Sequence, residues 1–201
     1  MTAKTVIIYG QKMISYKKTQ KEAHNMKNYL IVVDMQRDFV TGVLGSQEAV
    51  SILPAVKERI EKAKREGEAV IFTRDTHEEN YLETQEGKKL PVKHCVKNTA
   101  GWQIEDELLP LSEKCLIIDK PTFGSTALGE YLKAENEKDK IGKITLTGVC
   151  TDICVISNAL LIKAYLPEVE IYIEENCCAG VTKESHETAL SAMKSCQITV
   201  I

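Results

Sequence analysis

The chain has 201 residues, of which 43% are apolar and 27% charged, and its formal net charge is −3. This length suits one large domain, and the composition is that of an ordinary globular protein, which excludes a disordered or fibrous chain. No apolar run approaches the roughly 20 residues of a membrane span, and the weak negative charge gives no electrostatic case for nucleic acid as a partner. Seven cysteines, an odd number spread along the chain, predict free thiols in a reducing cytoplasm.

Residues 1–25 differ in composition from the rest of the chain. They hold five lysines and one glutamate, and their apolar island at 6–9 (VIIY) is too short for a signal-peptide core. We expect these residues to be a disordered basic leader, or sequence translated from upstream of the true start. Residues 26–201, which begin at Met26, are expected to form the folded domain.

From residue 29 onward, short apolar runs alternate with longer amphipathic stretches. In chain order they predict a strand over 29–33, a helix over 48–65 that ends at Glu66-Gly67, strands over 69–73, 115–118 and 144–147, a helix over 152–165, a strand over 169–173, a helix over 183–194 and a strand over 197–201. Strands that are apolar on both faces and alternate with helices predict a parallel sheet covered on both sides. The expected fold is therefore α/β, a three-layer α/β/α sandwich around a mostly parallel six-stranded, Rossmann-like sheet.

Reactive side chains follow four of the predicted strands. Asp34 ends the first strand, Asp75 and His77 follow the second, Lys120 follows the third, and Cys154 comes shortly after the fourth. In open parallel sheets the chemistry lies beyond the carboxyl ends of the strands. We therefore expect these groups to converge on one edge of the sheet.

The thiol, the ammonium and one carboxylate form a plausible nucleophilic set. A thiol attacks only as its thiolate, and its pKa is ordinarily about 8.5. Cys154 falls in the first turn of a predicted helix, where free N–H groups favour an anion, and the nearby Lys120 ammonium should lower the thiol pKa further. Asp34 can take the thiol proton and later pass it to a leaving amine. The structural alternative is a loop cap, a surface lysine and a small core cysteine.

These motifs resemble those of the isochorismatase-like cysteine hydrolases, and within that superfamily the nicotinamidases. The resemblance covers residues 29–201, and its pieces occur in the family's order: Asp-x-Gln from Asp34, Asp-x-His from Asp75, Lys120 after the third strand, and the long segment 148–155 (GVCTDICV) that contains Cys154. It implies that Asp34, Lys120 and Cys154 form a catalytic triad.

The resemblance also implies an oxyanion hole in segment 148–155. It places a cis peptide bond between Val149 and Cys150 and assigns the backbone N–H groups of Cys150 and Cys154 to the oxyanion. Backbone donors aimed at a tetrahedral oxyanion contribute several kcal/mol to amide hydrolysis. Residue 150 is a cysteine where the family often carries alanine, either as an inert small residue or as a thiol that can oxidise with Cys154.

A metal site is implied in the loop after the second strand. By resemblance, Asp75, His77 and His94 bind one divalent ion per chain, and carboxylate with imidazole suits Zn²⁺, Fe²⁺ or Mn²⁺ without choosing between them. Some relatives take a fourth ligand from the loop between the two histidines. Glu86 is expected in that role, with Glu83 and Glu79 as alternatives.

Aromatic residues could form the walls of a substrate pocket. The expected walls are Phe39, Trp102 and Phe123, with core packing as the alternative for Trp102 and Phe123. Buried packing is expected for Cys177 and Cys178, and the sequence offers no partner for His186.

The resemblance implies an amidohydrolase that converts nicotinamide and water to nicotinate and ammonia in NAD salvage, through a thioester on Cys154. Its partner would be a small-molecule amide, with a homo-oligomer left open. His77 is followed by EEN rather than by the proline and further histidine of many nicotinamidases. A metal-free relative that cleaves carbamoyl or ureido amides is therefore the alternative enzyme, and a non-catalytic thiol or metal-binding module is the alternative outside catalysis.

Overall fold

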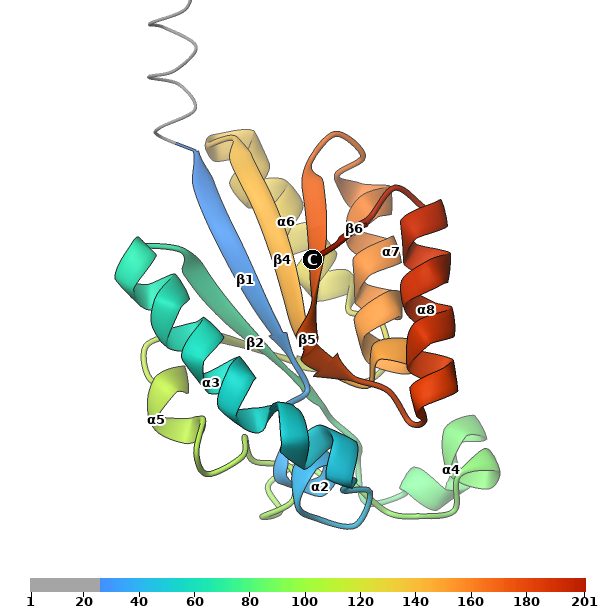
Figure 1. Cartoon of the computed structure of the whole chain (residues 1–201). Helices are drawn as coiled ribbons and strands as arrows, with labels where there is room; N and C mark the ends of the chain where they lie inside the picture. Colours follow the sequence, from blue (N-terminus) through green and yellow to red (C-terminus); the bar gives the residue numbers. More distant parts are fainter. Residues whose placement is uncertain (1–25) are drawn as a thin grey trace, which may run out of the picture.

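The computed structural model describes residues 26–201, so the expectations for residues 1–25 lie outside the described part of the chain. Figure 1 shows a twisted sheet with helices on both sides. Among the described residues, no helix is both long enough and apolar enough to cross a bilayer.

The sheet has six strands and every neighbouring pair is parallel. This confirms the predicted architecture and makes the sheet fully rather than mostly parallel. The strands are β1 (Lys27–Val33), β2 (Ala69–Asp75), β3 (Leu116–Lys120), β4 (Ile141–Val149), β5 (Glu170–Ala179) and β6 (Thr199–Val200), in the order β3-β2-β1-β4-β5-β6. The chain winds outward from β1 to one edge and then from β4 to the other, so the loops after β1 and β4 diverge at the switch point of the sheet.

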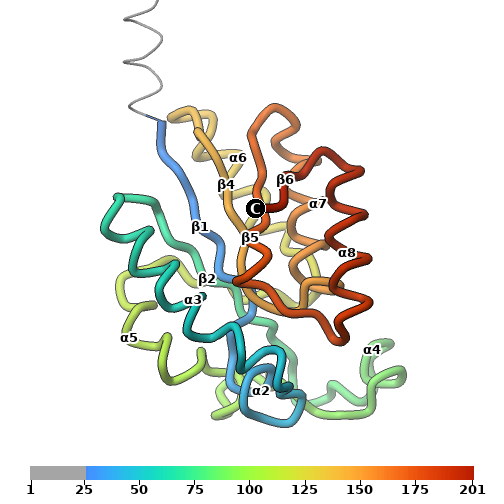
Figure 2. The backbone as a smooth tube through the Cα atoms, viewed as in Figure 1, coloured from blue at the N-terminus to red at the C-terminus, as the bar shows by residue number. Residues whose placement is uncertain are grey.

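Helices cover both faces, which produces the three expected layers (Figures 1 and 2). Helix α3 (Gln47–Glu66) packs on one face, while α6 (Thr126–Lys138), α7 (Ile156–Tyr165) and α8 (Lys183–Ser195) pack on the other. Successive residues of β1 point to opposite faces: Leu30 and Val32 join the core under α3, whereas Ile31 and Val33 join the core under α6, α7 and α8. A central strand buried on both faces must be apolar throughout, which is why β1 reads as one continuous apolar run.

The segment that carries Cys154 differs from its prediction. The helix expected over 152–165 is two elements, a π-helical turn η2 (Thr151–Val155) followed by α7. In η2 the Cys150 carbonyl accepts the N–H groups of both Ile153 (3.0 Å) and Val155 (3.1 Å). Cys154 therefore lies in a wider turn than the first turn of a regular helix. The other short elements are α2 (Arg37–Val40), η1 (Tyr81–Glu83), α4 (Gln85–Lys89) and α5 (Leu109–Ser112).

Other elements also depart from their predicted bounds, among them β4, which runs over Ile141–Val149 rather than 144–147, and β6, which covers only Thr199–Val200 of the expected 197–201. Helix α6 was not predicted, because its buried apolar side chains are few; Ser125 caps it by accepting the Leu128 N–H at 3.1 Å. The third strand begins after Cys115 rather than at it. Strand β5 continues through the positions of Cys177 and Cys178, because its end pairs with the end of β4, and both thiols are buried as expected.

Candidate active site and metal centre

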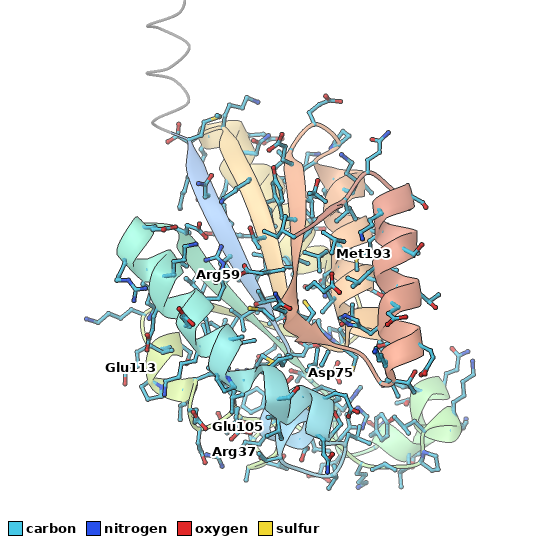
Figure 3. All side chains as sticks on the ribbon, viewed as in Figure 1. Arg37, Arg59, Asp75, Glu105, Glu113 and Met193 are labelled. Atoms are coloured by element: carbon cyan, nitrogen blue, oxygen red, sulfur yellow. The ribbon has the colours of Figure 1, made fainter. Side chains whose placement is uncertain are left out.

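The reactive groups meet at the carboxyl ends of the strands. Asp34 follows β1, Asp75 and Lys120 end β2 and β3, and Cys154 lies in η2 after β4. Figure 3 labels Asp75 at this end of the sheet, on the side where α2 and α4 lie. The predicted convergence on one edge therefore occurs, and it occurs at the switch point.

Lys120 lies at the centre of the expected triad. Its Nζ is 2.6 Å from Asp34 Oδ2 and 3.3 Å from Cys154 Sγ, and it also reaches Asp75 Oδ1 at 3.3 Å. Neither Lys120 nor Asp34 exposes any surface, and Cys154 keeps 5% of its own. A surface role for Lys120 is excluded, since its ammonium is buried between two carboxylates and a sulfur.

Burial is the largest single influence on the pKa of each triad residue. Burial and the Asp34 charge raise the pKa of the Cys154 thiol well above its ordinary value, and the Lys120 charge offsets only part of that effect. Burial likewise raises the pKa of Asp34, against the pull of Lys120. Burial opposes the charged form of Lys120, but the surrounding anions, Asp34 first, hold its pKa above the ordinary value. The thiol pKa thus moves in the direction opposite to the sequence expectation, because desolvation outweighs the single neighbouring cation.

Two polar residues that the sequence reading did not identify support the triad. Thr73, in β2, donates its hydroxyl to Asp34 Oδ1 at 2.7 Å. Asn158, in α7, donates to the Cys154 carbonyl at 2.8 Å and to the Phe123 carbonyl at 3.1 Å. The i, i+4 spacing of Cys154 and Asn158 is a signal that could have revealed the second residue, whereas the contact of Thr73 depends on strand pairing.

The turn before Cys154 has the backbone that the resemblance implied. The peptide bond between Val149 and Cys150 is cis. Gly148 precedes it with φ = 112°, and a Cβ there would lie 2.1 Å from the Val33 carbonyl oxygen. Only glycine fits this position, so the end of β4 can press against β1 and turn toward the site.

Four side chains form a candidate metal centre beside the triad. Donor atoms of Asp75, His77, Glu86 and His94 all lie within 4.8 Å of one another. Glu86 is therefore the glutamate of this loop that lies with the other three donors, while Glu79 pairs with Lys93 at 3.7 Å.

The structure contains direct evidence that these donors suit a cation. His77 Nε2 is buried and lies 2.9 Å from Asp75 Oδ2, yet it makes no hydrogen bond of suitable geometry. His94 Nδ1 lies 2.8 Å from the Val92 carbonyl, which orients the ring so that Nε2 lies 3.6 Å from Asp75 Oδ2 and 3.9 Å from Glu86 Oε1. An orphaned ring nitrogen and an oriented second imidazole, with two carboxylates, match the ligands of a divalent transition metal.

Hydrogen bonds of Gln36 connect the metal centre to the loop that carries Asp34. Its buried side chain donates to the carbonyls of Asp75 and Trp102, both at 2.9 Å, and accepts the Asp75 N–H at 2.7 Å. The glutamine side chain of the Asp-x-Gln motif therefore positions Asp75 by bonding the Asp75 backbone.

A cavity of about 670 Å³ opens onto both the triad and the metal centre. Phe39 and Phe123 line it, as expected, together with Cys150, Cys154 and His94. Trp102 is not among its walls: its indole N–H donates to Thr76 Oγ1 at 2.8 Å, and Arg74 stacks on its ring at 3.5 Å. The expectation of a pocket role for Trp102 is therefore wrong, and the packing alternative is correct.

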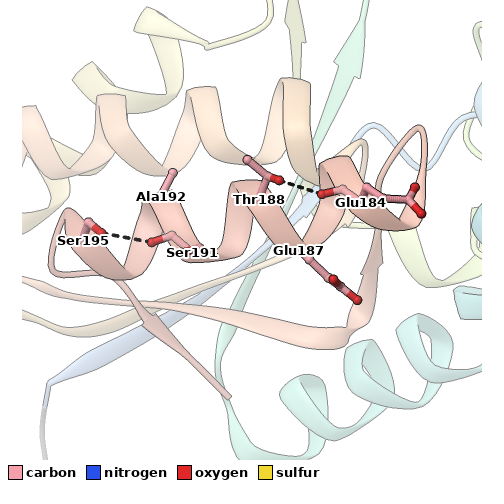
Figure 4. Close-up of a pocket in the computed structure, with 6 residues that line it drawn as sticks. All are labelled: Glu184, Glu187, Thr188, Ser191, Ala192 and Ser195. Atoms are coloured by element: carbon pink, nitrogen blue, oxygen red, sulfur yellow. Dashed lines mark hydrogen bonds between the residues drawn. The ribbon is translucent and has the colours of Figure 1, made fainter.

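A second hollow lies on the exposed side of α8 (Figure 4). It is lined by Glu184, Glu187, Thr188, Ser191, Ala192 and Ser195. These residues bring no thiol, imidazole or ammonium, so this hollow lacks the groups that make the strand-end cavity reactive.

The family model described as the isochorismatase domain matches residues 28–201. The chain belongs to the isochorismatase family. It is therefore an isochorismatase-family hydrolase, and the match covers all six strands apart from Lys27.

Known proteins of this family are similar along nearly their full length. The nicotinamidase of Schizosaccharomyces pombe is 28% identical over 206 residues, which cover 86% of this chain and 91% of that protein. The crystal structure of the pyrazinamidase of Pyrococcus horikoshii in complex with zinc has a TM-score of 0.76 and 32% identity, covering 87% of this chain and 98% of that one. The nicotinamidase/pyrazinamidase of Bacillus subtilis has a TM-score of 0.76 and 29% identity, covering 87% and 99%.

Proposed function

We propose that this isochorismatase-family hydrolase is a cytoplasmic nicotinamidase, which converts nicotinamide and water to nicotinate and ammonia. The observation that carries the proposal is the central position of Lys120, within 2.6 Å of Asp34 and 3.3 Å of Cys154, beside a four-donor metal centre on one cavity. The names of the relatives, nicotinamidases and pyrazinamidases, support an aromatic ring amide as the substrate.

Acylation of Cys154 begins with transfer of the thiol proton to Asp34. Asp34 takes the thiol proton while the sulfur attacks the carboxamide carbon, and its raised pKa makes it a stronger base than an ordinary aspartate. The N–H groups of Cys150 and Cys154 stabilise the oxyanion, with the Lys120 ammonium nearby. The C–N bond then breaks, Asp34 returns its proton to the leaving nitrogen, and ammonia departs from the thioester.

Hydrolysis of the thioester reverses the roles of the same groups. Asp34 accepts a proton from water while the oxygen attacks the acyl carbon. The C–S bond breaks, Asp34 protonates the departing sulfur, and the carboxylic acid ionises as it leaves. Phe39 and Phe123 provide flat apolar surface for the ring, because both line the cavity.

The metal centre would orient the substrate. Asp75, His77, Glu86 and His94 would hold one divalent ion. When bound, that ion would supply a Lewis acid that can take a ring nitrogen of the substrate as a ligand.

A second candidate is the hydrolysis of a carbamoyl or ureido amide by the same triad. It is favoured by the residues after His77, which read EEN instead of a proline and a further histidine. Both candidates share the nucleophile and differ in what recognises the substrate.

A substrate panel with measured metal content separates the two candidates. Purified protein is assayed for ammonia release from nicotinamide, pyrazinamide, benzamide and N-carbamoyl amino acids, before and after chelation. We expect nicotinamide and pyrazinamide to be preferred and their turnover to fall on chelation far more than that of benzamide, which lacks the ring nitrogen. A preference for the carbamoyl compounds that survives chelation would replace the nicotinamidase proposal with the second candidate.

A further inference from the structure

His186 contacts the turn that carries the nucleophile. Among residues 26–201 it is the imidazole that lies outside the metal centre, and it occupies the first turn of α8. Its Nδ1 lies 2.8 Å from Thr151 Oγ1, a hydrogen bond between residues 35 positions apart. Thr151 exposes no surface, directly follows Cys150 and begins η2. His186, for which the sequence offered no partner, therefore reaches the turn that carries Cys154 through the Thr151 hydroxyl.

A second contact ties the same turn to the loop between β5 and α8. Asp152 Oδ1 accepts the Val181 N–H at 3.0 Å. Gly180 lets the two segments approach, since a Cβ there would lie 2.9 Å from His186 Cβ and 3.0 Å from Asp152 Oδ1. Two adjacent residues of η2, Thr151 and Asp152, therefore each make a hydrogen bond, the first to α8 and the second to the loop that precedes α8.

The start of α8 is itself well anchored. Thr182 and Ser185 form a capping box in which each side chain bonds the other's backbone N–H. The His186 N–H donates to the Thr182 carbonyl at 3.0 Å. The imidazole therefore projects from a fixed helix start, and it can hold the rotamer of Thr151 rather than follow it.

We propose that His186 is a positioning residue for the nucleophile turn. Through Thr151 it holds the backbone N–H groups of Cys150 and Cys154 in the orientation that stabilises the oxyanion. This inference rests on the proposed amide hydrolysis. His186 does not line the cavity, so it acts through Thr151 and not on the substrate. Since oxyanion donors act mainly in the transition state, their displacement should lower kcat and leave KM nearly unchanged.

The test compares variants at both ends of the hydrogen bond. His186→Ala should lower kcat about tenfold or more, with KM within about twofold of wild type. His186→Asn, whose side-chain amide can either donate to or accept from Thr151 Oγ1, should recover most of that loss. The double variant of His186→Ala with Thr151→Val should lose no more than the worse single variant, because the two residues act as one unit. Thr188→Ala is the matched control on α8, since that hydroxyl bonds only within its own helix, to the Glu184 carbonyl (Figure 4).

Hydrogen exchange provides a readout that does not depend on turnover. In His186→Ala, amide exchange should quicken over residues 149–155 and stay unchanged over 126–138, which belong to a different helix. A wild-type kcat and unchanged exchange in His186→Ala would overturn the positioning role. A rise in KM with no rescue by asparagine would overturn it too and leave only a packing role. Failure of the proposed function appears differently, as no ammonia release by the wild type, and the exchange data alone then decide whether His186 holds the turn.

Discussion

The Nζ of Lys120 lies 3.3 Å from the Sγ of Cys154, and Lys120 exposes no surface whereas Cys154 keeps 5% of its own and lines the cavity. Asp34 stands on the other side of the ammonium at 2.6 Å. One cation therefore lies between a thiol and a carboxylate that can each carry a negative charge. In this arrangement a single proton can move between sulfur and carboxylate without creating an unpaired buried charge, which suits repeated proton transfer during acyl transfer.

Replacing the nucleophile should abolish turnover and spare the fold. Cys154→Ala is expected to reduce ammonia release to background, because Cys154 is the cavity thiol that lies within 3.3 Å of the Lys120 ammonium. The measurement is steady-state ammonia release with circular dichroism as the check on folding. Cys196→Ala, which changes an exposed thiol, is the control and should retain wild-type rates. Wild-type turnover by Cys154→Ala would refute the assignment of the nucleophile.

The charges around the thiol should shift its reactivity in opposite directions. Burial and Asp34 raise the pKa of Cys154, whereas Lys120 lowers it. In Lys120→Met the pKa should rise further, so the pH profile of iodoacetamide alkylation moves to higher pH. In Asp34→Asn an anion is lost, the thiolate becomes easier to form, and the profile moves to lower pH. Mass spectrometry of the Cys154 peptide measures the extent of alkylation at each pH in both variants. Identical profiles in the wild type and the two variants would show that neither charge influences the thiol pKa.

Lys120→Met should also slow acylation by about a hundredfold, the usual effect of losing one charged donor in a site closed to water. Lys120→Arg should restore little, since a planar guanidinium does not replace a compact ammonium between Asp34 and Cys154. Burst-phase kinetics measure this step. A rate within about threefold of wild type in Lys120→Met would remove Lys120 from the triad.

Metal content should depend on the four clustered donors. Protein purified without chelator is expected to hold about one divalent ion per chain, and His94→Ala should lose it. Glu86→Ala should weaken retention during dialysis, whereas Glu83→Ala, at an exposed position of η1, should not. Elemental analysis after dialysis gives the result. Full retention in Glu86→Ala with loss in Glu83→Ala would assign the fourth ligand to the other glutamate.

Gln36 should matter for stability as well as for the metal. Gln36→Leu keeps the volume but removes three buried hydrogen bonds to Asp75 and Trp102, so the free energy of unfolding should fall by about 2–4 kcal/mol. Urea unfolding measures this change, with Gln47→Ala on the exposed start of α3 as the control. The variant should also release its metal more easily, because the Asp75 backbone is no longer held. A change below about 0.5 kcal/mol would show that water replaces the lost partners.

Local patterns were sufficient wherever the relevant interaction is local in the chain. The continuous apolar run of β1 and the spaced apolar residues of α3, ended by Gly67, reveal their elements because periodicity and helix ends are properties of adjacent residues. The strand-end positions of Asp34, Lys120 and Cys154 follow from the same patterns together with the rule for parallel sheets. The weakly apolar α6 gave too little signal to be predicted.

The remaining features depend on contacts between distant parts of the chain. Four glutamates lie between His77 and His94, and only the packing of η1 and α4 brings Glu86 to the metal centre. Trp102 resembles a pocket wall in sequence, but its hydrogen bond to Thr76 places it in the core.

The sequence by itself determined the fold class and the reactive residue types at the strand ends, because periodicity and strand order are encoded locally. The tertiary structure alone decided the ionisation of Cys154 and the partner of His186. Burial at the switch point raises the thiol pKa despite the neighbouring cation, and α8 delivers an imidazole to Thr151 from 35 residues away. Desolvation and long-range hydrogen bonds depend on which surfaces pack together, and no local pattern specifies that packing.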